Sequence, residues 1–290
     1  MSKWKKWLIG EWSWWRPLKS FAFIYLALLG VALFFSNKLI YQPPQPGYKP
    51  DDANMFQVTR PGGEKVMLYY TPAAQGMPTL LWSHGNAEDI GYLHDRLCRF
   101  NSRGYGILAY DYPGYGHSEG TPTEEGCYEA VEAAYNHLTQ KLKVPTEQII
   151  IYGQSVGSGP AVWLAAQKPC RGLLLVSPFV SAFRAVTKIP LFPGDQFKNI
   201  HRISDIQSPL LVIHGDEDCV ISQWHGKKLY DLHPGPKTFI DIPGAGHNDL
   251  YTLAMDQILD ALDAFNTSTQ EKAKVAPQKN LTTLPGTPAA

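Results

Sequence analysis

The stretch that decides the fold is IIIYGQSVGSGPAVWLAAQ, which occupies residues 149–167. Its first four residues are β-branched or aromatic and predict a strand, and residues 158–167 are compatible with a helix. Between them, Gly153-Gln154-Ser155-Val156-Gly157 fits the pattern Gly-x-Ser-x-Gly, in which a serine lies on a tight turn from strand to helix. A Gly-rich turn with an incidental serine has the same letters, so the pentamer needs support from the rest of the chain.

Short apolar runs recur on both sides of this stretch, and longer amphipathic runs separate most of them. We expect seven strands, at about residues 66–70, 79–83, 106–110, 148–152, 172–176, 210–214 and 238–242. Strands that alternate with helices are typical of a mostly parallel sheet with helices on both faces. The sequence therefore predicts an α/β domain over residues 52–265, with a short lid at residues 177–208.

A serine hydroxyl is a poor nucleophile at neutral pH and needs a base, which in turn needs an acid to hold its tautomer. Two groups of polar residues follow the ends of predicted strands, HGDED at residues 214–218 and GAGH at residues 244–247. Because the carboxyl ends of parallel strands lie along one edge of a sheet, loops distant in sequence converge there. We expect His247 to be the base for Ser155, since it lies in a Gly-rich loop between the last strand and the last helix.

The acid must come from three adjacent candidates, Asp216, Glu217 and Asp218. Asp218 occupies the last position of the turn and can point across the edge of the sheet. Asp216 is better placed to cap the turn itself. We therefore predict Asp218 as the acid and keep Asp216 and Glu217 as alternatives.

Acyl transfer also needs hydrogen-bond donors for the oxyanion of the tetrahedral intermediate. The residue after the nucleophile, Val156, supplies one backbone amide. The second is expected from SHGNA at residues 83–87, where a glycine allows the turn and Asn86 presents its amide. We interpret His84 as a structural residue at the end of a strand rather than as a catalytic base.

These motifs, together with Asp111-Tyr112-Pro113-Gly114-Tyr115-Gly116, resemble the α/β-hydrolase superfamily over roughly residues 52–265. Within it, the chain is most similar to the small-lid, often membrane-tethered serine hydrolases that include the protein depalmitoylases with an α/β-hydrolase domain. The patterns NIxxIxxI from residue 199 and HGxxLY from residue 225 strengthen this similarity. The resemblance implies hydrolysis of an ester or thioester with no cofactor. Those depalmitoylases are tethered through acylated N-terminal cysteines, which this chain lacks.

An uncharged apolar run, FAFIYLALLGVALFF, occupies residues 21–35. With its flanks it covers residues 18–40, which reach roughly 34 Å as a helix against a hydrocarbon core of about 30 Å. We expect a membrane anchor, with Lys19 and Lys38 reaching the interfaces. A cleaved signal peptide is the competing interpretation, but residues 34–37 offer no small-x-small cleavage site. A buried core helix is the third, and it fits poorly with the five tryptophans among residues 4–15, which suit a lipid headgroup layer.

The charges beside the apolar run predict its orientation. Five basic residues precede it and two follow it closely; they are Lys3, Lys5, Lys6, Arg16 and Lys19, then Lys38 and Lys49. This bias keeps residues 1–17 in the cytoplasm, so the catalytic domain is expected on the other side of the membrane. Residues 41–51 are Pro-rich and are expected to form a stiff linker, and residues 266–290 a disordered tail.

Composition excludes several other classes of protein. The 26 basic and 26 acidic residues balance, and no basic stripe follows the body of the chain, which argues against nucleic acid as a partner. The four cysteines form no metal-binding pattern, so we expect no metal. The four cysteines could form two disulfides or be buried free thiols, and the sequence leaves both interpretations open. We expect a monomer.

The lid suggests the substrate. Its phenylalanines, among them Phe179, Phe183 and Phe192, are candidates to line a groove for an acyl chain. The other interpretation is that they simply pack the lid onto the core. We therefore expect an acylated or lipid-like substrate, either a small molecule, a lipid or a lipidated protein. A serine aminopeptidase and a non-catalytic binding protein on the same fold are the competing functions.

Overall fold

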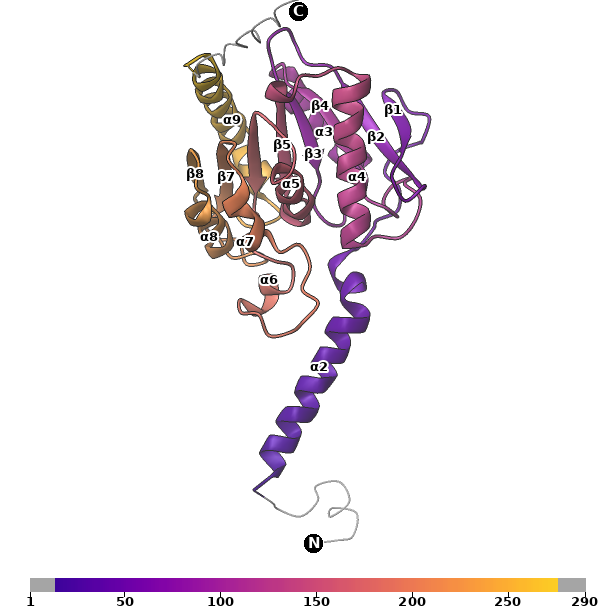
Figure 1. Cartoon of the computed structure of the whole chain (residues 1–290), viewed down its shortest axis with the longest axis vertical. Coiled ribbons are helices and arrows are strands. Elements are labelled where there is room, and N and C mark those ends of the chain that lie inside the picture. Colours follow the sequence, from indigo (N-terminus) through magenta and orange to yellow (C-terminus); the bar gives the residue numbers. More distant parts are fainter. Residues whose placement is uncertain (1–13, 276–290) are drawn as a thin grey trace, which may run out of the picture.

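The computed structural model describes residues 14–275, with side chains up to residue 270. Helix α2 (Arg16–Ile40) projects from an α/β domain as a long rod, and the lid, which carries α6 (Arg184–Thr187), lies beside its upper part (Figure 1). The strands are β1 (Met55–Thr59), β2 (Lys65–Thr71), β3 (Thr79–Ser83), β4 (Gly106–Tyr110), β5 (Ile149–Gln154), β6 (Gly172–Val176), β7 (Leu210–Gly215) and β8 (Lys237–Ile242). The longer helices of the domain are α3 (Ile90–Ser102), α4 (Glu124–Asn136), α5 (Ser158–Ala165), α8 (Trp224–Leu232) and α9 (Leu250–Val275).

All eight strands form one sheet in the order β1-β2-β4-β3-β5-β6-β7-β8. From β4 to β8 every neighbouring pair is parallel, whereas β1 and β2 pair antiparallel at one edge. The seven predicted strands are confirmed to within two residues at each end. Strand β1 was not expected, because it is an edge strand whose residues are only half-buried or exposed and give no strong apolar pattern.

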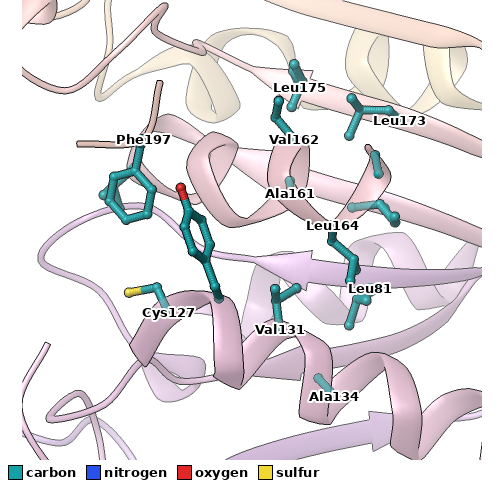
Figure 2. Packing of buried hydrophobic residues seen from close by; sticks show 14 of the residues in the cluster. Leu81, Cys127, Val131, Ala134, Ala161, Val162, Leu164, Leu173, Leu175 and Phe197 are labelled. Carbon is teal, nitrogen blue, oxygen red and sulfur yellow. The ribbon is translucent and has the colours of Figure 1, made fainter. Parts of the chain in front are cut away.

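Helices cover both faces of the sheet and bury two apolar layers. On one face, α4, α5 and α8 pack over β5, β6 and β7; Figure 2 shows Ala161 and Val162 of α5 among Leu173, Leu175 and Val131. On the other face, α3 and α9 cover side chains of the same strands that point the opposite way. The predicted α/β-hydrolase architecture is therefore confirmed. Helix α5 is apolar all round because it lies between the sheet and α4.

The segment after α2 packs against the domain instead of forming a free spacer. Tyr41 is buried in the core, and its ring meets Phe197 of the lid edge-on. Farther along, the Tyr48 hydroxyl donates a 2.6 Å hydrogen bond to the Asp111 carboxylate. The expected linker at residues 41–51 has no helix or strand, but its two tyrosines bury ring surface. Packed side chains therefore occur from Tyr41 onward, within the segment expected to be a linker.

The C-terminal helix also extends beyond the expected end of the domain at residue 265. Helix α9 continues to Val275, and Asn266 and Thr269 are buried. Arg171 holds this extension, because its guanidinium donates to the Thr269 hydroxyl and the Asn266 carbonyl, each at 2.9 Å. The rest of the expected tail, from residue 276, and the tryptophans before residue 14 lie outside the described residues.

Candidate active site

Ser155 lies on the sharp turn between β5 and α5, at the carboxyl end of the sheet. Its φ of 50° is left-handed, a conformation that non-glycine residues adopt only when their surroundings hold them there. The glycines on either side allow this turn. A Cβ on Gly157 would lie 2.2 Å from the Ser83 carbonyl oxygen, and one on Gly153 would lie 2.6 Å from the Gly157 carbonyl oxygen. The Gly-x-Ser-x-Gly pattern therefore reflects backbone contact between β5, α5 and the end of β3.

The structure brings Ser155, His247 and Asp218 together from three separate loops. His247 Nε2 lies 3.0 Å from Ser155 Oγ, and His247 Nδ1 lies 2.7 Å from Asp218 Oδ2. Residues 92 positions apart in sequence thus share one hydrogen-bond chain. This arrangement orients the imidazole so that Nε2 faces the serine hydroxyl, provided that Nδ1 carries the proton and donates to the carboxylate.

Asp218 is buried and accepts hydrogen bonds on both oxygens. Its Oδ1 accepts from the backbone N–H groups of Val220 at 2.9 Å and Ile221 at 2.7 Å, while Oδ2 faces His247. Burial by itself would raise the pKa of Asp218, but hydrogen bonds from His214, His247 and Ile221 outweigh it and lower that pKa below its usual range. The carboxyl group is therefore ionised at neutral pH.

The neighbouring acids have other contacts. Asp216 Oδ1 accepts a 2.7 Å hydrogen bond from the Gly244 N–H, so its side chain joins the turns after β7 and β8. The backbone N–H of Glu217 donates to the Ala245 carbonyl at 3.1 Å, again between the same two turns. Of the three candidates, only Asp218 is hydrogen-bonded to His247 within the described part of the chain.

The loop after β3 carries Asn86 to the same edge of the sheet. The Asn86 side chain makes several hydrogen bonds: its Nδ2 donates to the Ile40 carbonyl at 2.7 Å, and its Oδ1 accepts from the Gln42 N–H and the Tyr115 hydroxyl. Among the described residues its backbone N–H has no hydrogen-bond acceptor. A backbone donor at Asn86 is thus left for a ligand. Val156, directly after Ser155, is almost wholly buried at the start of the turn.

Comparison with known proteins identifies relatives of this chain. The family model described as serine aminopeptidase, S33, matches residues 76–193. The Caenorhabditis elegans alpha/beta hydrolase domain-containing protein aho-3 is 34% identical over 246 residues, which cover 74% of this chain and 73% of that protein. The human alpha/beta hydrolase domain-containing protein 17B is 40% identical over 196 residues, covering 66% of this chain and 68% of its own length.

The chain belongs to the α/β-hydrolase superfamily. Among solved structures, an esterase from Pyrococcus furiosus superposes on the hydrolase with a TM-score of 0.63 and 18% identity, over 80% of this chain and 98% of the esterase. At that identity the likeness is one of fold. The resemblance drawn from the sequence motifs is therefore confirmed at the level of the superfamily.

The three lid phenylalanines of this hydrolase lie in different surroundings. Phe179 is buried in the core beside Phe197, which agrees with a packing role. Phe183 is half-buried at the start of the lid helix α6 (Arg184–Thr187). Phe192 stacks on Tyr25 of α2, with ring centroids 5.5 Å apart. A groove lined by all three stays a prediction.

Sequence reasoning missed a polar network beneath the nucleophile of the hydrolase. Arg96 donates to the Gln154 side chain at 2.9 Å and lies 3.4 Å from the Glu88 carboxylate. Glu88 in turn accepts from the Gly85 N–H at 2.8 Å. Arg96 thus joins the residue before Ser155 to the loop that carries Asn86. Its position in the middle of α3 gave no motif by which to find it.

Two histidines of the hydrolase support the loops from inside. His84 is fully buried, with Nδ1 2.7 Å from the Gly85 carbonyl and Nε2 3.4 Å from Asp111, in agreement with a structural role. His214 is also buried, with Nε2 2.8 Å from the Ile221 carbonyl and 3.4 Å from Asp218. The sequence identified His214 only as a residue at the end of a strand. It holds the loop that presents Asp218.

The cysteines are unpaired, and Cys98 and Cys219 are exposed whereas Cys127 is buried. Their thiols lie in separate elements of the fold. In the described part of the hydrolase, three or more His, Cys, Asp or Glu side chains never gather closely enough to hold a metal ion.

Proposed function

We propose that this hydrolase cleaves carboxylic ester or thioester bonds through Ser155, His247 and Asp218. The observation that carries the proposal is the hydrogen-bond chain from Ser155 Oγ to His247 Nε2 at 3.0 Å and from His247 Nδ1 to Asp218 Oδ2 at 2.7 Å. This chain supplies a nucleophile, a base and an ionised acid in the order that acyl transfer requires. The strained turn places the Ser155 hydroxyl at the carboxyl edge of the sheet, where a substrate could reach it.

In the acylation step, Ser155 Oγ attacks the substrate carbonyl carbon while His247 Nε2 accepts the hydroxyl proton. The negative Asp218 stabilises the imidazolium that forms. The oxyanion receives hydrogen bonds from the backbone N–H groups of Val156 and Asn86, and each such donor is worth about 3 kcal/mol of transition-state stabilisation. Collapse of the intermediate breaks the bond to the alcohol or thiol, which leaves with the proton from His247.

In the deacylation step, a water molecule takes the place of the leaving group. His247 Nε2 removes a proton from that water, and the resulting hydroxide attacks the acyl-enzyme carbonyl. The same two backbone donors stabilise the second oxyanion. Collapse of the intermediate releases the carboxylic acid, and the proton returns from His247 to Ser155 Oγ.

We infer an acylated or lipid-like substrate from the surroundings of the site. Helix α2 is long and apolar enough to cross a membrane, its apolar window is 0% buried, and it ends at the loop that carries Asn86. A lipid or a lipidated protein would meet the site at that position. Depalmitoylation, which the resemblance to membrane-tethered hydrolases implies, requires in addition that the domain faces the side of the membrane where acylated proteins lie.

We propose that α2 is a single-pass anchor with its N-terminus in the cytoplasm. The support is the bias of basic residues, since Arg16 and Lys19 belong to a group of five that precede the apolar run. A reporter fused after Ala290 should then be found on the non-cytoplasmic side of the membrane. Finding the reporter in the cytoplasm would show the opposite orientation, and cytoplasmic acyl-proteins would then be the preferred substrates. Release of a shortened chain, found by mass spectrometry, would identify a signal peptide instead.

A fluorophosphonate probe tests the proposed nucleophile on purified full-length protein. The wild type should be labelled on Ser155, and Ser155→Ala should lose the label together with at least about 10⁴-fold of its rate on p-nitrophenyl esters. Ser102→Ala is the matched control, because that hydroxyl is exposed on α3 and bonds only the Arg99 carbonyl. If Ser155→Ala were labelled as strongly as the wild type, Ser155 would not be the nucleophile. Esters of increasing chain length then measure the preferred acyl group.

The description of the matching family model favours one competing function, hydrolysis of an N-terminal peptide bond. The same triad chemistry serves both reactions, so the substrate decides between them. Amino-acid p-nitroanilides should be hydrolysed at least 100-fold more slowly than p-nitrophenyl butyrate. The opposite preference would make the chain a peptidase.

A further inference from the structure

We propose that the tip of the lid, residues 186–193, lies inside the lipid bilayer and is held there by α2, so that α2 is part of the site as well as its tether. The proposed occupant of the surface is the acyl-chain layer of a phospholipid membrane. The inference rests on the proposed membrane span and deepens the proposed lipid-like substrate class.

Exposed apolar side chains lie at one edge of the domain. Beyond α2, the described residues expose seven large apolar side chains, which are Tyr92, Val186, Ile189, Leu191, Val220, Trp224 and Leu253. Three belong to the lid, and the other four lie in loops or first helical turns that follow β3, β7 and β8. In a parallel α/β sheet, these positions share the carboxyl edge. This is the edge where α2 is attached through Ile40 and Asn86.

The lid contacts α2 at two places. Near the middle of α2, Tyr25 stacks on Phe192 and donates a 3.3 Å hydrogen bond to the Leu191 carbonyl. Close to the domain, Gln196 donates to the Asn37 side chain at 2.7 Å and accepts from the Tyr41 hydroxyl at 3.1 Å. The lid and α2 are thus joined at two points twelve residues apart along the helix, Tyr25 and Asn37.

Together with the proposed membrane span, these contacts give the depth of the lid. The twelve residues from Tyr25 to Asn37 span about 18 Å of helix. The polar residues Ser36, Asn37 and Lys38 mark the end of the apolar run, and Tyr25 lies ten residues before Phe35, about 15 Å deeper. Half the thickness of a hydrocarbon core is also about 15 Å. If α2 spans the membrane, Leu191 and Phe192 must lie near its middle.

Several backbone groups of the lid tip are already hydrogen-bonded or absent. Three of its carbonyl groups accept hydrogen bonds from side chains: Lys188 from Arg184, Ile189 from Thr187, and Leu191 from Tyr25. Pro190 and Pro193 have no N–H group and so remove two donors that hydrocarbon cannot satisfy. Lys188 is the one charged residue between positions 185 and 194, and its long side chain can reach toward the headgroups.

This arrangement opens the site toward the membrane. The lid begins after β6, where the Phe179 carbonyl and the Ser158 hydroxyl both meet Asn199, so its roots are fixed to the helix that follows Ser155. An acyl chain that leaves the bilayer beside α2 would approach the edge of the sheet that carries Ser155. A lipid-embedded ester is then a better substrate than the same ester in solution.

The depth of the lid is measured on full-length protein in phosphatidylcholine vesicles. In a background of Cys98→Ser and Cys219→Ser, an environment-sensitive dye is attached at Leu191→Cys. The reference sites are Ile24→Cys, which is exposed on α2, and Glu147→Cys, which is exposed at the amino end of β5. We expect lipids doxylated at carbon 12 to quench positions 191 and 24 at least twofold and to leave position 147 unquenched. If the dye at position 191 is as little quenched as the dye at position 147, the proposal is overturned. It is also overturned if the dye at position 24 is not quenched.

The role of α2 is tested with Tyr25→Ala, which removes both the stack on Phe192 and the bond to Leu191. The matched control is Phe23→Ala, an aromatic residue of α2 that is 74% exposed. Tyr25→Ala should at least halve the quenching at 191 and lower the rate on a vesicle-embedded palmitoyl ester relative to soluble p-nitrophenyl acetate at least fivefold. Equal effects of the two variants would overturn the proposal. Failure of wild type to cleave the soluble ester would instead contradict the proposed hydrolase function and leave the depth measurement intact.

Discussion

The Asn86 side chain donates a 2.7 Å hydrogen bond to the carbonyl of Ile40, the last residue of α2. The loop of the proposed oxyanion donor is therefore bonded directly to the end of the proposed membrane anchor. Because Asn86 Oδ1 also accepts from the Gln42 N–H, the chain is held on both sides of Tyr41. The position of the backbone donor at Asn86 depends on where α2 ends.

Replacing Asn86 with Ala keeps the backbone N–H but removes the side-chain bonds to Ile40, Gln42 and Tyr115. We expect kcat on p-nitrophenyl butyrate to fall about 10-fold or more, because a displaced donor stabilises the oxyanion less well. Stability should fall by about 1–3 kcal/mol. Asn101→Ala is the control, since it removes a side-chain bond to the Tyr105 carbonyl at the other end of α3. Equal losses of kcat would contradict a positioning role for Asn86.

Exchanging the acids one at a time distinguishes their roles. Asp218→Asn should reduce kcat about 10³–10⁴-fold, because an amide in that position no longer fixes the tautomer of His247 or stabilises its charge. Asp216→Asn keeps an oxygen for the Gly244 N–H and should lose less than 10-fold. Steady-state kinetics at pH 8 measures both. Similar losses would show that the acid within residues 216–218 was chosen wrongly.

The sequence was sufficient for most of the fold because the parallel strands are buried on both faces and read as continuous apolar runs. Strand β1 and the packing of Tyr41 were missed for the opposite reason. The edge strand alternates only weakly, and the Pro-rich segment gives no sign that Tyr41 and Tyr48 are packed.

The candidate site was predictable where a residue follows a strand within a Gly-rich motif, as Ser155 and His247 do. Those loops must meet at the carboxyl edge, so sequence order and topology together are enough. Arg96 and the contact between Phe192 and Tyr25 were not predictable. Each depends on side chains from distant elements that meet only in three dimensions.

A methyl group at Gly157 should prevent the active fold. Its Cβ would lie 2.2 Å from the Ser83 carbonyl oxygen, and backbone on both sides leaves no flexible side chain to move away. Gly157→Ala should lower stability by about 3 kcal/mol or more and remove fluorophosphonate labelling. Gly30→Ala, in open space on α2, serves as the control and should unfold at the wild-type temperature. Thermal unfolding in detergent measures both variants.

Stability should fall in mild acid because of His225. The pKa of His225 is lowered from 6.5 to about 4. Burial is the largest cause, followed by His214 and by the positive charges of Arg184 and Lys188 in the lid. As pH falls, the imidazole of His225 is protonated in the unfolded chain before it is protonated in the folded one. The contribution of neutral His225 to the free energy of unfolding is therefore complete above pH 6.5 and is lost as pH falls toward 4. Between pH 7.5 and pH 5 the loss is about 2 kcal/mol.

The measurement is the urea midpoint of His225→Gln at both pH values, with the exposed His201→Gln as control. A glutamine keeps an acceptor for the Val180 N–H, which meets His225 Nδ1 at 3.4 Å. The His225 variant should lose clearly less stability in acid than wild type and the control. A decline of the same size in all three proteins would show that His225 does not carry the effect.

Two truncations test where the packed domain begins. A chain that starts at Tyr41 retains the buried ring and the bond from Tyr48 to Asp111, whereas a chain that starts at residue 52 loses both. We expect residues 52–290 to be less stable by at least about 3 kcal/mol, because two packed aromatic rings are removed. Chemical denaturation of the two soluble chains measures the difference. Equal midpoints would restore the boundary at residue 52.

The burial of Tyr41 directly after α2 also has a kinetic consequence. If α2 spans the membrane as proposed, a junction fixed on both sides of one packed ring restricts how the domain can turn relative to the membrane, and so restricts the height and tilt of Ser155. An enzyme confined in this way samples substrate in two dimensions. Its rate on an embedded ester should therefore follow the mole fraction of that ester among the surrounding lipids, and diluting the ester with inert phospholipid should slow turnover even when its total concentration is unchanged.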